Sequence, residues 1–83
     1  ILTNLTQIIE RAVRSVFQTY VEALKKENKF TKDAQLKALD LAKVEVLKQI
    51  SNETAEFIKD NYGDIDYFIT SQIESTINLL KNV

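Results

Sequence analysis

The sequence contains no cysteine, histidine, proline, methionine or tryptophan, and it has a single glycine. Without cysteine there is no disulfide framework, and without cysteine or histidine the usual zinc ligands are missing. The same absences remove the Ser/His/Asp and Cys/His nucleophile systems and leave no side chain whose ordinary pKa lies near neutrality. We therefore expect no enzyme activity, no cofactor, no metal site and no small-molecule substrate.

The chain also lacks a large net charge, because its eleven basic residues nearly balance its twelve acidic ones. No net field attracts nucleic acid, and we expect no nucleic-acid partner. The charge is unevenly distributed, however: residues 25–48 carry seven lysines against four acids, whereas residues 49–83 carry two lysines against six acids. This asymmetry favours antiparallel helices whose surfaces attract one another, within the chain or between subunits.

Long hydrophobic runs are absent as well, and no stretch approaches the length of a transmembrane helix. A chain of 83 residues is one domain, residues 1–83, near the size at which a single core gives marginal stability and oligomerisation often helps. The sequence begins at Ile1 and contains no methionine, so we expect a piece of a longer protein. Any membrane segment of that protein would lie outside these residues.

The strongest pattern lies in residues 1–26, where apolar residues recur three and four positions apart in two adjacent seams. One of these seams runs as far as Ala23 and is broken only at Thr19. A helix this apolar is expected to be buried on more than one side. Two arrangements remain open: other helices of the same chain cover both seams, or one seam packs against a second subunit. The candidate self-association residues are Leu2, Leu5, Ile9, Val13, Val16, Phe17 and Tyr20.

Two further helices are predicted after the polar stretch "KKENKF". Thr31 is an N-cap candidate for a helix over residues 32–50, and Ser51 is an N-cap candidate for a short helix over residues 52–61. The apolar face predicted for the first of these comprises Leu36, Leu39, Val46 and Ile50, widened by Ala38, Leu41 and Ala42. The short helix is expected to bury Ala55, Phe57 and Ile58.

The stretch "NYGDIDY", residues 61–67, separates the third predicted helix from a fourth over residues 65–81. Gly63 suits the left-handed conformation that ends a helix, Asp64 is an N-cap residue, and Asp66 falls in the first turn. Calcium loops need more oxygen ligands in a different order, so capping is the favoured interpretation of the aspartates. Tyr62 and Tyr67 are expected to pack against the corner.

Five lysines surround the first interhelical loop: Lys25, Lys26, Lys29, Lys32 and Lys37. Nucleic-acid readers usually interleave arginine or aromatic residues with such a patch, and this chain has only two arginines. We interpret the patch as a solvated loop, with contact to anionic lipid headgroups as a second possibility only if the parent protein is anchored in a membrane. Taken together, the sequence predicts an all-α domain of three to four amphipathic helices with a long first helix, assembling as a helical-bundle oligomer.

Residues 12–81 resemble the C-terminal cytosolic region of LL-H-type phage and prophage holins. The resemblance rests on "VFQTYVEALK", on "NKFTKDAQLKAL", and on "YGD" followed by the "TSQIES" helix. It departs from the family pattern at Asn28, where relatives often have glycine, although asparagine also tolerates left-handed geometry. The resemblance implies one transmembrane helix upstream and a place at the cytoplasmic face of the bacterial membrane.

The favoured functional hypothesis is therefore a non-enzymatic self-assembly domain, the soluble part of a phage-derived, membrane-anchored holin-like protein. The alternative is a soluble helical adaptor or regulatory module. Such a module would bind another protein through the turn between Tyr62 and Phe68 or through the lysine-rich loop.

Overall fold

The computed structural model describes the backbone of residues 2–81 and the side chains of residues 3–78. Within this part of the chain there are four helices and no strand, as the sequence predicts. The first helix has three segments, α1 (Leu2–Val16), the π-helical η1 (Phe17–Val21) and α2 (Glu22–Lys26). The others are α3 (Lys32–Gln49), α4 (Asn52–Tyr62) and α5 (Ile65–Lys81).

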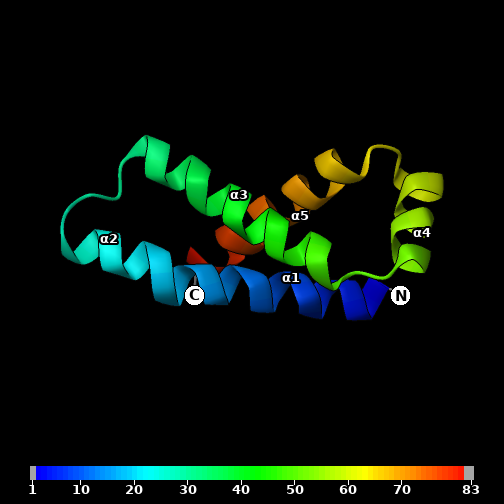
Figure 1. Ribbon diagram of the computed structural model, residues 1–83, viewed down its shortest axis with the longest axis horizontal. Helices are drawn as coiled ribbons and strands as arrows, with labels where there is room; N and C mark the ends of the chain where they lie inside the picture. Colours follow the sequence, from blue (N-terminus) through cyan, green and yellow to red (C-terminus); the bar gives the residue numbers. More distant parts are fainter. Residues whose placement is uncertain (1, 82–83) are drawn as a thin grey trace.

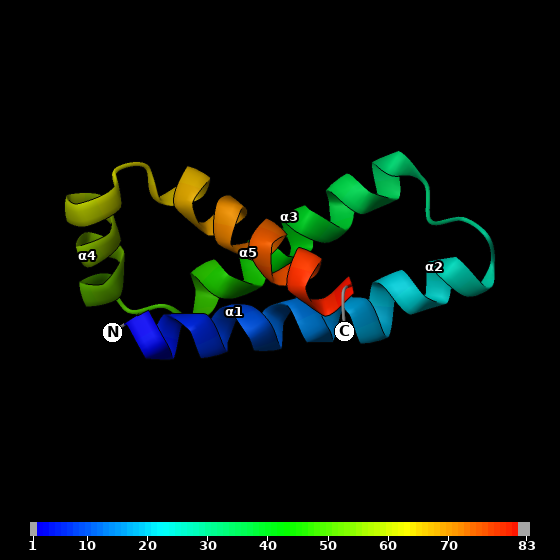
Figure 2. The same cartoon turned by 180° about the vertical axis from the view of Figure 1, so that it is seen from behind.

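The helices form an elongated domain of 42 × 23 × 20 Å. The first helix runs along one long edge, and α3 crosses it diagonally on the way back (Figure 1). The short α4 closes one end of the molecule, and α5 then returns behind α3, as the reverse view shows (Figure 2). At the other end α2 and the start of α3 diverge toward the loop that joins them.

Each predicted N-cap makes the expected hydrogen bond. Thr31 Oγ1 accepts from the N–H of Ala34 at 3.2 Å, and Ser51 Oγ accepts from the N–H of Thr54 at 3.1 Å. At the start of α5 the Asp64 carboxylate accepts from the N–H of Tyr67 at 2.9 Å. These bonds satisfy backbone donors that have no partner inside the helix, which is why short polar residues fix the three helix starts.

The π-helical segment η1 explains a break in the predicted seam at Thr19. Its i→i+5 pattern ends with the N–H of Glu22 donating to the carbonyl of Phe17. The buried positions therefore step by five residues from Val16 to Val21. Beyond this point no residue of α2 is buried, and Ala23, expected to continue the seam, is exposed.

The core is built where α1, α3 and α5 meet, and Ile58 of α4 closes it at one end. Its fully buried larger side chains are Val13, Val21, Val46, Ile58, Ile69 and Ile73. In α4, Ile58 is buried as expected, whereas Ala55 and Phe57 are only half-buried and Thr54 takes a buried place instead. The Ser51 hydroxyl lies 3.0 Å from that of Thr54, so this buried polar group is hydrogen-bonded.

Candidate functional site

The apolar residues of the first helix face the inside of the chain. Of the predicted self-association residues, Leu5, Ile9, Val13 and Val16 are buried in the core, and Phe17 and Tyr20 are partly buried against it. The side chain of Leu2 lies outside the described residues. Helices α3 and α5 of the same chain cover the four buried residues. Phe17 and Tyr20 keep part of their surface exposed, and self-association through them stays a prediction.

Helix α3 presents the opposite arrangement, with small residues inside and large ones outside. It buries Ala34, Ala38, Ala42 and Val46. Its exposed large aliphatic residues, here called the α3 outer stripe, are Leu36, Leu41, Val44 and Leu47. Leu36, which is 60% exposed, and Leu41 were predicted to face inward, and that prediction is wrong. Alanine brings α3 close to α1, and at such short range there is room for few leucines between the helices.

A groove of about 340 Å³ opens where α2 and α3 diverge, and we call it the wedge groove. Its apolar walls come from Phe17 of η1, Phe30 of the loop, Leu39 of α3 and Ile77 of α5. The Lys25 ammonium lies 5.6 Å from the centre of the Phe30 ring, a cation–π arrangement. Glu74 is the carboxylate that lines the groove, beside the amides Gln35 and Asn78.

Sequence reasoning missed the wedge groove because its lining residues come from four separate segments of the chain. The one local signal was the seam break at Thr19, which marks the π turn that places Phe17 at the groove. Single π turns inside α-helices are often found at functional sites.

The turn between α4 and α5 contains the helix-ending glycine and the N-cap aspartate that the sequence predicts, with one difference in backbone geometry. Gly63 has φ +88° and ψ −127°, and its N–H donates to the carbonyl of Lys59 at 3.2 Å. The positive φ is as expected, but ψ lies outside the left-handed helical region. This combination is open to glycine and strained for other residues, so the turn depends on Gly63 more strongly than a left-handed cap would.

The two tyrosines of this turn differ in their surroundings. Tyr62 braces the corner: its ring stacks on Phe68 with centroids 4.5 Å apart and meets the edge of Phe57 at 6.4 Å. Tyr67 was predicted to pack there too, but it is 76% exposed. The turn therefore presents one free aromatic ring beside Asp64 and Asp66.

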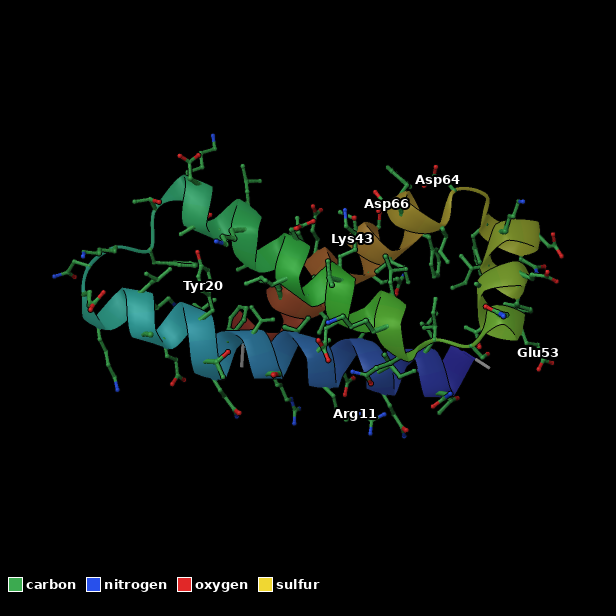
Figure 3. The ribbon with its side chains drawn as sticks, viewed as in Figure 1. Arg11, Tyr20, Lys43, Glu53, Asp64 and Asp66 are labelled. Carbon is green, nitrogen blue, oxygen red and sulfur yellow. The ribbon has the colours of Figure 1, made fainter. Side chains whose placement is uncertain are left out.

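Among the described residues, one ion-pair network joins the lysine-rich residues 25–48 to the acidic residues 49–83. Lys43 Nζ of α3 lies 3.1 Å from Asp66 Oδ1 of α5 and 3.7 Å from Asp40 Oδ1 (Figure 3). The hydrogen bond to Asp66 raises the pKa of Lys43 above its ordinary value, while desolvation opposes that rise. The predicted attraction between these two stretches thus exists within the chain, between α3 and α5.

Residues 3–78 contain no cluster of three or more acidic side chains able to hold a metal ion. The polar side chains of Gln7, Glu10, Arg11 and Arg14 border a second hollow, but all come from one face of α1. Arg11 points away from the other helices (Figure 3). The candidate sites of this chain are therefore surfaces: the α3 outer stripe, the wedge groove and the turn around Tyr67.

Comparison of the chain with protein-family models, with curated proteins and with solved structures finds no match. Within the described residues, no helix combines the length and the hydropathy needed to cross a membrane.

Proposed function

We propose that this chain is a non-enzymatic helical self-assembly domain, the soluble part of a phage-derived, membrane-anchored holin-like protein. The observation that carries the assembly part is the α3 outer stripe, which leaves four large aliphatic side chains on one helix exposed to solvent. Leu41, Val44 and Leu47 follow one another at three-residue spacing, which makes them neighbours on the helix surface, and exposed apolar groups placed together mark an interaction site more often than scattered single residues do. The sequence resemblance to LL-H-type holins supports the remainder of the proposal.

The occupant we propose for the stripe is α3 of a second copy, running antiparallel. Leu36 and Leu47 lie near the two ends of the stripe, with Leu41 and Val44 between them, so a two-fold axis near its middle brings like surfaces together.

Sedimentation equilibrium at tens of micromolar tests the assembly. The wild-type chain should sediment as a reversible oligomer, and the variant Val44→Asp/Leu47→Asp should sediment as a folded monomer, because a carboxylate in an apolar contact is desolvated without a partner. A matched control is Gln7→Asp/Gln72→Asp, which adds the same charge at exposed positions on α1 and α5. A wild-type chain that stays monomeric, with unchanged circular dichroism, would refute self-assembly and favour the adaptor alternative.

The membrane part of the proposal has its own test. The gene that encodes this chain should specify an apolar segment long enough to span a bilayer upstream of Ile1, which would hold this domain at the cytoplasmic face. An upstream sequence without such a segment would remove the holin-like part and leave the assembly part standing.

A further inference from the structure

The two ends of the domain carry opposite charge. The basic end, around α2 and the start of α3, has Lys25, Lys26, Lys29, Lys32 and Lys37 against Glu22, Glu27 and Asp33. The acidic end, formed by α4 and the start of α5, has Glu53, Glu56, Asp60, Asp64 and Asp66 against Lys59. These ends lie at opposite extremes of the 42 Å axis (Figures 1 and 3), so they cannot pair within one chain.

Each end also carries one half of an apolar contact. The basic end contains the wedge groove, whose aromatic and aliphatic walls surround about 340 Å³ of open space. The acidic end presents the ring of Tyr67, which is 76% exposed. The Tyr67 N–H donates to the Asp64 carboxylate at 2.9 Å, so the backbone that carries this ring is held in place before any partner arrives.

We infer that the wedge groove of one copy takes the Tyr67 ring of a second copy, so that the domain assembles head to tail. The ring packs on Phe17, Phe30 and Ile77, and its hydroxyl donates to Glu74. Around this contact the lysines of one copy face the carboxylates of the next. A tyrosine in an apolar pocket with a polar group at its end is the kind of anchor that dominates interface energies.

This inference rests on the proposed self-assembly and adds a second contact to it. A head-to-tail contact is heterologous, because different surfaces of the two copies meet, and it repeats until the chain of copies closes into a ring or continues as a filament. The α3 outer stripe pairs like with like and closes after two copies. The two contacts share Leu36, which borders both surfaces, and use different residues elsewhere.

The absence of cysteine allows a direct test by engineered disulfides. Ser71→Cys, one helical turn from Tyr67 on α5, and Gln35→Cys, which lies at the groove, are made as separate single-cysteine chains that keep the Tyr67 ring, and they are mixed under mild oxidation. Head-to-tail docking predicts a mixed disulfide at least about tenfold above the level for Ser71→Cys with Gln7→Cys, an exposed position on α1. Mixed disulfide no higher than in that control pair would overturn the inference.

A charge-reversal pair tests the electrostatic part. Lys25→Glu/Lys29→Glu places acids at the basic end, where Lys25 lines the groove, and Glu56→Lys/Asp60→Lys places bases at the acidic end. Each variant alone should associate head to tail at least about tenfold more weakly than wild type, whereas their equimolar mixture should recover the affinity because each groove then meets an opposite charge. The measurement is sedimentation equilibrium in low salt, in the Val44→Asp/Leu47→Asp background that removes stripe pairing.

The outcomes separate the two proposals. If the wild-type chain associates and the mixed disulfide is absent, then self-assembly stands and the head-to-tail contact is wrong. If the mixed disulfide forms and the reversed pair recovers affinity, the contact is established even where Val44→Asp/Leu47→Asp removes the stripe. If the charge-reversed mixture is no tighter than either variant alone, lysine–carboxylate pairing plays no part and the inference fails as stated.

Discussion

The first helix and α3 both carry many apolar residues, yet the chain uses them in opposite ways. Among the described side chains of α1, residues 3–16, the large aliphatic ones face the core and the outward positions are polar. In α3 alanines face the core, while Leu36, Leu41, Val44 and Leu47 face solvent. The difference teaches that apolar periodicity locates amphipathic helices but does not say which partner covers each face, since a face can be covered by the same chain or by another one.

The sharpest test of this comparison is a pair of truncations. Ile9→Ala in α1, where the side chain is 3% exposed, should lower the free energy of unfolding by about 2–5 kcal/mol through lost burial and a residual cavity. Leu36→Ala in α3 should lower it by less than about 0.5 kcal/mol, because that side chain is mostly solvated. Urea denaturation at low protein concentration measures both. Equal losses at the two positions would contradict the assignment of inside and outside.

A second test compares the two turns that contain a residue with positive φ, Asn28 after the first helix and Gly63 after α4. Gly63→Ala should lower the free energy of unfolding by about 1–3 kcal/mol, because alanine is strained at φ +88° and ψ −127° although its Cβ meets no other atom. Asn28, with φ +57°, lies in the left-handed region that asparagine tolerates. Asn28→Gly should therefore change the free energy of unfolding by less than about 0.5 kcal/mol. Glycine relieves strain in the folded state but also gives the unfolded chain more freedom, and these two effects oppose each other. The melting temperatures of both variants test these expectations. A Gly63→Ala variant that melts at the wild-type temperature would contradict the strain expected for alanine at this position.

The smallest expected effect on stability comes from the ion pair between Lys43 of α3 and Asp66 of α5. A folded-state pKa above the ordinary value of 10.5 means that the lysine contributes stability fully below that pH and loses it as the pH rises through the folded-state value. Lys43→Met should destabilise the fold slightly at neutral pH, less so in high salt, and not at all above the folded-state pKa.

Chemical denaturation of wild type and Lys43→Met at several pH values gives the difference directly. Lys48→Met is the matched control, because Lys48 is exposed on the same helix. A difference that grows with rising pH would have the wrong sign for this ion pair.

Local signals were enough to predict most of the fold. The N-caps Thr31, Ser51 and Asp64 and the single glycine placed the helix boundaries within about a residue or two of those in the structure, because capping depends on neighbours in sequence. The candidate site was predicted less well. The seam on the first helix proved to be core, and the wedge groove was missed because Phe17, Phe30, Leu39 and Ile77 meet only after folding.

The sequence by itself determined the all-α class, the extent of each helix, the chemistry of the caps and the charge asymmetry between the middle and the last third. These follow from propensity, periodicity and short-range hydrogen bonds, which act within a few residues. Only the tertiary structure decided that α3 turns its alanines inward, that the first helix is covered by its own chain, and that the basic and acidic ends lie farthest apart. Those outcomes depend on how closely the helix backbones approach one another, and side-chain size sets that distance only when the facing residues are known.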